Sequence, residues 1–213
     1  GVDLQEGDNP LTMIAADLAG NERQFQATLT RSGQALADDP VLTWNQVLLD
    51  AIRLDATAPP VASRSLAMVH AAVYDAVSAI EGTPSLYVAL DAPAGASVEA
   101  AVAAAAHRVL VYVFPAQQTA FDAALTASLA TVPDGPGETD GAALGGAAGD
   151  ALIALRARDG WNDFEPYAGN TESGVWRPTL PMFAPALLPQ WATLQPFVMT
   201  SPDQFRPAGP PDL

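Results

Sequence analysis

The spacing of apolar residues changes from two to about 3.6 near residue 40 of the chain. Before that point, polar and apolar residues alternate over 24–29, as in a half-buried strand, and shorter apolar runs cover 2–4 and 11–15. Gly, Asn and Pro between these runs predict turns, one of them at 6–10. The pattern therefore predicts a β-rich arm over residues 1–32.

After a polar linker over 33–40, apolar residues recur three and four positions apart in five segments as far as residue 160. The inward positions predicted by this spacing are Trp44, Val47, Leu48, Ala51 and Leu54 or Asp55; Leu66, Val69, Val73, Val77 and Ile80; Val98, Val102, Ala105, Val109 and Val113; Phe121, Leu125 and Leu129; and Leu144, Ala148, Leu152 and Leu155. Short connections and small Ala and Gly faces favour close antiparallel packing. The expected fold is mainly α, with an antiparallel bundle of about five helices over 41–160.

Helix start and stop signals support these segments. Pro59 and Pro60 suit the first turn of a helix, and Gly82 suits a left-handed C-terminal position. Ser97 is a good N-cap, and Glu99 lies near the positive end of the same helix.

The remaining residues, 161–213, combine aromatic side chains with many prolines. Nine prolines between residues 174 and 213 exclude a regular helix or a central strand, because each fixes φ and removes a backbone donor. We therefore expect an extended Pro/aromatic segment that needs a partner surface.

This segment resembles one that joins two helical halves in bacterial vanadium-dependent haloperoxidases and the related type 2 phosphatidic acid phosphatases. The residues that carry the resemblance are Trp176, Arg177, Pro178, Trp191, Pro196, Phe197, Gln204, Phe205, Arg206 and Pro207. Together with the helices before it, the resemblance covers residues 41–213. It implies that the chain is the first half of a haloperoxidase-like domain and that 161–213 links it to a catalytic half.

The catalytic blocks of that family read K-x6-R-P, P-S-G-H and S-R-x5-H. The chain contains no lysine and no P-S-G-H, so the first two blocks are missing. Ser63, Arg64 and His70 spell the third block, whose histidine binds vanadate in the family. No residue before them in the sequence could help to hold an oxyanion, so we interpret His70 and Arg64 as structural residues. They are still the two candidates if the chain has a catalytic site.

The resemblance implies a vanadate-dependent enzyme that oxidises halide with peroxide, of which this chain is a non-catalytic half. Vanadate is then expected in the parent protein and not on this chain alone, and the main partner is the C-terminal half of the same protein. An acid phosphatase of the same superfamily is one alternative, because phosphate and vanadate share geometry. A non-catalytic extracellular interaction module is another, and a homo-oligomer is left open.

The composition of the chain bears on its partners and on its possible metal sites. The formal net charge of −15 argues against nucleic acid and anionic membrane surfaces as partners. No apolar run is long enough to span a bilayer, and the chain has no cysteine. His107, the second histidine, lacks metal-ligand spacing to His70, and the helix carboxylates Asp50, Asp55, Asp75 and Asp122 are expected in ion pairs with Arg53, Arg64 or Arg108. Residues 1–32 are similar to the closing strands of bacterial extracellular Ig-like modules, which implies an exported, extracellular or periplasmic protein.

Overall fold

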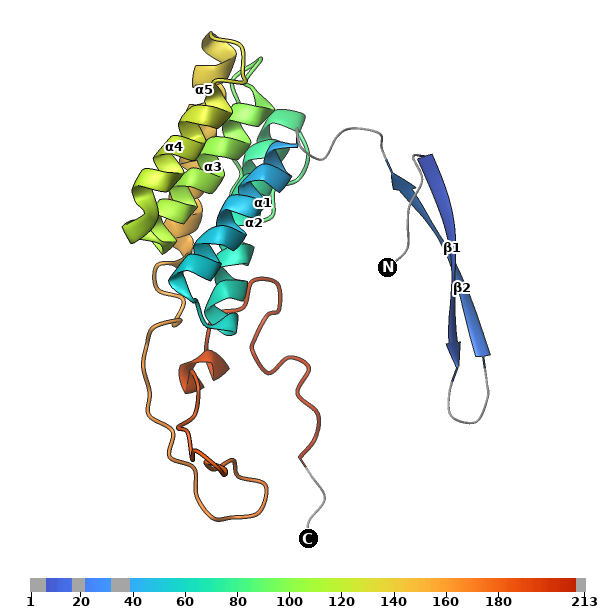
Figure 1. Cartoon of the computed structure of the whole chain (residues 1–213), viewed down its shortest axis with the longest axis vertical. Helices are drawn as coiled ribbons and strands as arrows, with labels where there is room; N and C mark the ends of the chain where they lie inside the picture. Colours follow the sequence, from blue (N-terminus) through green and yellow to red (C-terminus); the bar gives the residue numbers. More distant parts are fainter. Residues whose placement is uncertain (1–6, 17–21, 32–38, 210–213) are drawn as a thin grey trace. The chain divides into compact units, whose positions relative to one another are not determined.

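The computed structural model describes residues 7–16, 22–31 and 39–209. It divides into two compact units, Gly1–Thr43 and Trp44–Leu213. The first unit contains an antiparallel hairpin of strands β1 (Gly7–Ala16) and β2 (Glu22–Arg31). The second contains most of a helical bundle and the Pro/aromatic segment (Figure 1).

The hairpin is longer than the alternation predicted. Its register pairs Gly7 with Arg31 and Ala16 with Glu22, so the expected turn at 6–10 is wrong for residues 7–10. Pro10 pairs with Thr28 in a two-stranded ladder, where both strands are edges and proline is tolerated. The expected strand at 2–4 and nearly all of the linker lie outside the described residues.

Five α-helices pack together, which confirms the mainly α fold. They are α1 (Pro40–Asp55), α2 (Pro59–Glu81), α3 (Val98–Val113), α4 (Gln118–Leu129) and α5 (Pro136–Arg156). A 3-10 turn at Pro115–Gln117 joins α3 to α4.

The helix boundaries follow the predicted signals. Pro59 and Pro60 lie in the first turn of α2, and Gly82 ends it at φ 67°, with its N–H bonded to the carbonyl of Ser78. The hydroxyl of Ser97 accepts from the backbone N–H of Ala100 at 3.1 Å, as an N-cap should. Local sequence therefore sets where these helices begin and end.

Helix α3 is the centre of the bundle, with α2, α4 and α5 packed against it (Figure 1). Every residue from Ala100 to Ala106 is buried, so the helix is surrounded rather than one-sided. Alanine fits here because three neighbours must approach one axis closely. The single apolar face predicted for this helix was too narrow.

The contact between α3 and α5 has no room for a side chain at Gly141 or Gly145 of α5. A Cβ added to Gly145 would lie 2.1 Å from the carbonyl oxygen of Ala101, and one added to Gly141 would lie 2.3 Å from that of Ser97. Gly146, on another side of α5, has open space. The four-residue spacing of the crowded glycines thus lets two backbones touch.

Two inward predictions at helix ends are wrong. Leu54 and its alternative Asp55 are both exposed at the end of α1, and Leu155 is exposed at the end of α5. Arg156, the next residue, is buried instead. The elements that surround a helix end differ from those that surround its middle, so the mid-helix repeat no longer predicts which residues are buried there.

We call residues 161–209 the strap. It contains one short 3-10 helix, Pro189–Ala192, and otherwise runs through turns and extended stretches from the end of the bundle where α5 finishes (Figure 1). Within the strap only Gln190 is buried. The irregular backbone expected from the prolines is thus present.

Within the described part of the chain, no single helix has the length and apolarity needed to cross a bilayer. Helices α3 and α4 reach that length and apolarity only when counted together, and the chain bends by 120° between them.

Candidate functional site

The most highly charged buried site lies where the bundle meets the strap. It consists of Arg64 on α2, Arg156 at the end of α5, and Asp159, which together we call the arginine cluster. Asp159 Oδ2 accepts from Arg64 Nε at 2.8 Å and pairs with an Arg156 Nη nitrogen at 2.9 Å. All three residues are at least 96% buried, with exposures of 4%, 1% and 2%. One carboxylate therefore serves two arginines out of contact with water.

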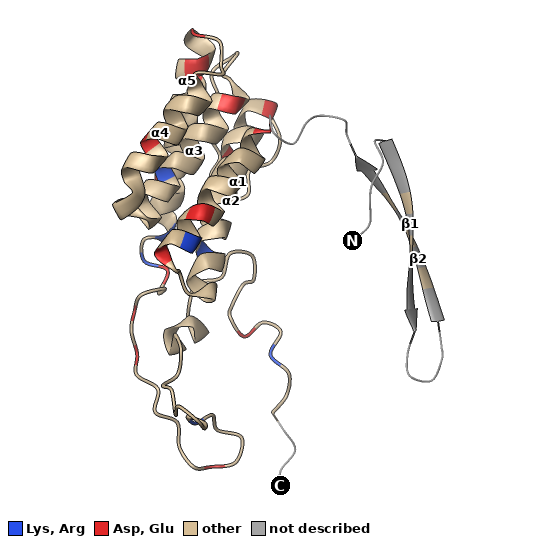
Figure 2. Cartoon of the chain, viewed as in Figure 1, with Lys and Arg blue, Asp and Glu red and all other residues tan. Residues whose placement is uncertain are grey.

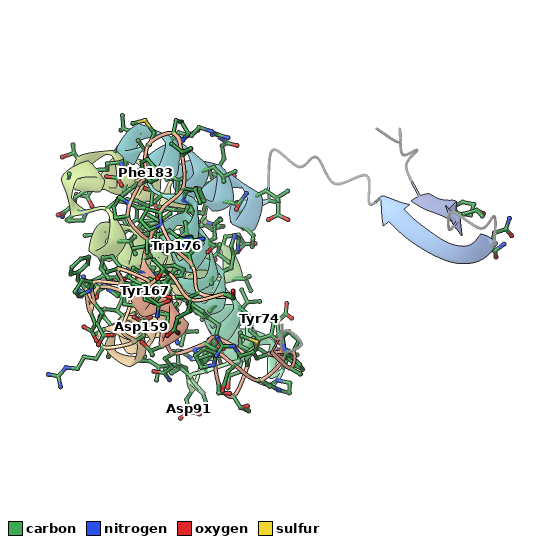
Figure 3. All side chains as sticks on the ribbon, turned by 90° about the horizontal axis from the view of Figure 1, so that it is seen from below. Tyr74, Asp91, Asp159, Tyr167, Trp176 and Phe183 are labelled. Carbon is green, nitrogen blue, oxygen red and sulfur yellow. The ribbon has the colours of Figure 1, made fainter. Side chains whose placement is uncertain are left out.

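Aromatic rings of the strap cover both guanidinium groups. The Trp161 ring centroid lies 5.1 Å from the Arg64 guanidinium carbon, and that of Phe197 lies 3.9 Å from the Arg156 carbon. Both are within the range of cation–π attraction, which strengthens when water is excluded. Figure 3, viewed toward this end of the bundle, labels Asp159 with Tyr167, Trp176 and Phe183 of the strap.

The arginines also bind backbone carbonyls. Arg64 donates to the carbonyl of Arg156 at 3.0 Å and so caps the end of α5. Arg156 donates to the carbonyls of Gln195 at 2.6 Å and Pro196 at 3.2 Å. Tyr87, in the loop after α2, donates its hydroxyl hydrogen to the carbonyl of Phe197. The cluster thus ties two helices, one loop and the strap together.

The arginine cluster contains two arginines and one carboxylate, so it carries an excess of buried positive charge. Burial lowers the pKa of Arg156, and the nearby Arg64 lowers it further, while Asp159 opposes the shift. An arginine remains charged even so. Burial likewise raises the pKa of Tyr87, against the effect of Arg156. The Nε of Arg156 is buried without a hydrogen-bond partner among the described residues.

The cluster does not fit an oxyanion such as vanadate. An oxyanion needs several converging donors, but here the guanidinium hydrogens go to Asp159 and to backbone carbonyls. The Asp159 carboxylate itself occupies the position that an anion would take between the two arginines. A single unpaired Nε hydrogen cannot replace that set.

The two candidate residues from the sequence do not converge. Arg64 and His70 are six residues apart on α2, which places them roughly 120° apart around the helix. Arg64 reaches Asp159, whereas His70 Nε2 lies 3.0 Å from Asn45 Oδ1 on α1. The S-R-x5-H spacing therefore joins no common site within the described residues.

Asp75 serves the backbone and not an arginine. This carboxylate is 1% exposed and accepts from the backbone N–H groups of Leu86, Tyr87 and Val88 at distances from 2.5 to 3.3 Å. The expectation that it pairs with an arginine is wrong. Several N–H groups converging on one carboxylate satisfy it as a counter-ion would, and they fix the loop that carries Tyr87.

The other side-chain pairs are at least partly exposed. Asp50 pairs with Arg53 at 2.6 Å, Arg108 with Asp150, and His107 Nε2 with Asp122 Oδ1 at 2.7 Å. Asp55 instead accepts from the hydroxyl of Thr57. No group of three or more His, Cys, Asp or Glu side chains suited to a metal ion occurs within the described ranges. Red carboxylates are scattered over the bundle, whereas several blue arginines gather at its strap end (Figure 2).

Sequence reasoning missed Arg156, Asp159 and Tyr87. A local signal existed, because Arg156 and Asp159 stand three residues apart at a helix end and Trp161 follows them. The partner Arg64 is 95 positions away from Asp159, so no spacing rule could bring it in.

Comparison with known proteins identifies a similar fold but does not assign the chain to a family. No protein-family model matches the chain, and no curated protein matches it. Among solved structures, it is similar to one titled as the crystal structure of the first bacterial vanadium-dependent iodoperoxidase. The TM-score is 0.66 at 22% identity, over 83% of this chain and 46% of that one. The expected Ig-like module finds no support in these comparisons, and the chain shares the fold of less than half of the iodoperoxidase.

Proposed function

We propose that this chain is the structural, amino-terminal half of a vanadate-dependent haloperoxidase-like enzyme. The main support is the structural similarity to the bacterial iodoperoxidase, which extends over most of this chain but under half of that protein. In this proposal a second helical half of the same protein holds the vanadate and performs the halide oxidation.

The donor set of the described residues supports that division of labour. The two buried arginines are committed to Asp159 and to carbonyls, and His70 is bonded to Asn45. These groups hold the fold together and are not arranged around a common anion. Anion-binding residues are therefore assigned to the other half.

The strap supplies the surface for that partner. Its exposed large apolar side chains are Phe164, Tyr167, Trp176, Leu180, Met182, Phe183, Leu187, Val198, Met199 and Phe205. A pocket of about 410 Å³ lies among them, lined by Trp176 and by residues between Thr179 and Leu187. So many exposed apolar groups in one segment mark an interaction surface. We assign it to the second half of the same protein, and we propose that the protein works outside the cytoplasm.

An activity comparison tests the proposal. The 213-residue chain and the full product of its gene are assayed for iodide and bromide oxidation by hydrogen peroxide, with and without vanadate. We expect vanadate-dependent activity from the full product only. His70→Ala in the full product should keep that activity, because His70 belongs to a helix contact. Halide oxidation by the 213-residue chain would overturn the assignment. So would loss of activity in a His70→Ala variant whose circular dichroism and urea midpoint match those of the wild type.

Two other outcomes distinguish the alternatives. Cleavage of p-nitrophenyl phosphate without halide oxidation would identify a phosphatase, since phosphate and vanadate share geometry. The absence of both activities would favour an interaction module, a function that the apolar strap surface also fits.

A further inference from the structure

Residues 162–188 of the strap form a loop that is closed at its base. The carbonyl of Trp161 accepts from Gln190 Nε2 at 3.1 Å and from Trp191 Nε1 at 3.3 Å. The N–H of Gln195 donates to the carbonyl of Asp159 at 2.9 Å. Two segments some thirty positions apart therefore run side by side where the strap leaves the bundle.

Two side chains, Arg156 and Tyr87, hold that base against the helices. Arg156 reaches the carbonyls of Gln195 and Pro196 and lies against the ring of Phe197, so it engages three consecutive strap residues. Tyr87 holds Phe197 as well, through its hydroxyl and through an edge-to-face contact of the two rings, whose centroids lie 6.3 Å apart. Asp75 fixes the backbone of Tyr87 in turn.

The loop beyond this base depends on its own contacts. Tyr167 and Trp176 rings lie 5.8 Å apart, and Gly169 approaches the carbonyl of Trp176 so closely that a Cβ would collide with it. Every hydrogen bond seen for residues 164–187 is internal to that range or reaches only Asn162 beside it. Nothing described there bonds to the bundle.

We propose that Arg156 is a latch: it clamps residues 195–197 to the bundle, and breaking it loosens residues 189–197 of the strap while the five helices stay folded. The charges favour such a separation. Without Arg156, Arg64 and Asp159 remain as a matched pair, so no buried charge is left alone. This inference concerns the chain's own conformation and stands whether or not the proposed function does.

Hydrogen exchange measured by mass spectrometry on the 213-residue chain tests the latch. Arg156→Met keeps the length of the side chain and removes its donors, whereas Arg156→Lys keeps the charge but loses the planar fork. Arg177→Met is the matched control, because Arg177 is an exposed strap arginine. In both Arg156 variants, peptides covering 189–197 should exchange at least tenfold faster, with a smaller increase at 86–88. Peptides from α2, α3 and α5 should keep the wild-type rate.

Tyr87→Phe keeps the test decisive if Arg156→Met folds poorly. Removing this one hydroxyl should speed exchange in the same two regions about threefold, in the same pattern, with the helices unchanged. The latch is refuted if strap exchange stays at the wild-type rate in Arg156→Met, or if the helical peptides accelerate as much as the strap. An equal effect of Arg177→Met would refute it too.

Discussion

The bundle and the strap are held in place by different forces. In α3, residues Ala100 to Ala106 are buried without a single charged group, and their order comes from close packing. In the strap only Gln190 is buried, and order comes from hydrogen bonds to carbonyls and from rings laid on guanidinium groups. Packing is spread over many contacts, whereas the strap depends on a few identifiable atoms. Single substitutions should therefore separate the two regions.

The largest effect is expected at Asp159, where the two regions meet. Asp159→Asn leaves two buried arginines facing each other without their shared counter-ion, and should lower the free energy of unfolding by about 3–5 kcal/mol. Urea denaturation followed by circular dichroism measures this. Asp163→Asn, at an exposed carboxylate four residues further on, should change stability by less than about 0.5 kcal/mol. Equal stability of the two variants would mean that the cluster does not anchor the junction.

A second substitution breaks the bundle alone. Gly145→Ala places a Cβ against the backbone of Ala101 and Ala105, so α3 and α5 must move apart, at a cost of about 1–3 kcal/mol. Gly146→Ala is the matched control in open space and should stabilise by about 0.5–1 kcal/mol, because alanine is the better helix former. Thermal and urea unfolding of both variants gives opposite signs if the axes touch as described. A gain from Gly145→Ala would show that they do not.

The sequence predicted the helices more fully than it predicted the junction, the place where the arginine cluster joins the bundle to the strap. The caps at Gly82 and Ser97 depend on neighbouring residues only, so local signals were sufficient. The full burial of α3 depends on how many neighbours surround it, and no periodicity reports that number. The hairpin register extended past Pro10 because pairing with β2 decided it.

The junction shows the same limit more sharply. Arg64 was singled out for its spacing to His70, yet its partner Asp159 lies at a distance in sequence that only the fold closes. Asp75 was expected to pair with an arginine, and three backbone N–H groups took that place. Residue type thus indicated where charge had to be neutralised, but not by which group.

A smaller effect is expected at Tyr87, whose contribution to stability should depend on pH. Burial raises the pKa of the Tyr87 hydroxyl above its ordinary value of 10.0, so the folded state favours the protonated form. The stability that Tyr87 contributes is full below about pH 10 and is lost as pH rises through the higher folded pKa. Losing its bond to Phe197 should cost about 1 kcal/mol. Urea midpoints measured from pH 8 to 11 should fall less steeply in Tyr87→Phe than in the wild type, and parallel curves would contradict the prediction.

The smallest effect is expected within the bundle, at the pair of His107 on α3 and Asp122 on α4. The Nε2–Oδ1 distance is short at 2.7 Å, but the Asp122 side chain is 52% exposed. Water screens such a pair, and holding both side chains costs entropy, so the coupling should be about 0.5 kcal/mol. A double-mutant cycle with His107→Ala, Asp122→Ala and both together isolates that energy at pH 7. A coupling above about 2 kcal/mol, more than exposed pairs usually reach, would mean that this one side-chain contact holds α4 to the bundle, as a few side chains hold the strap. A value near zero would leave the burial of Phe121 as its attachment, in keeping with the packing that orders α3.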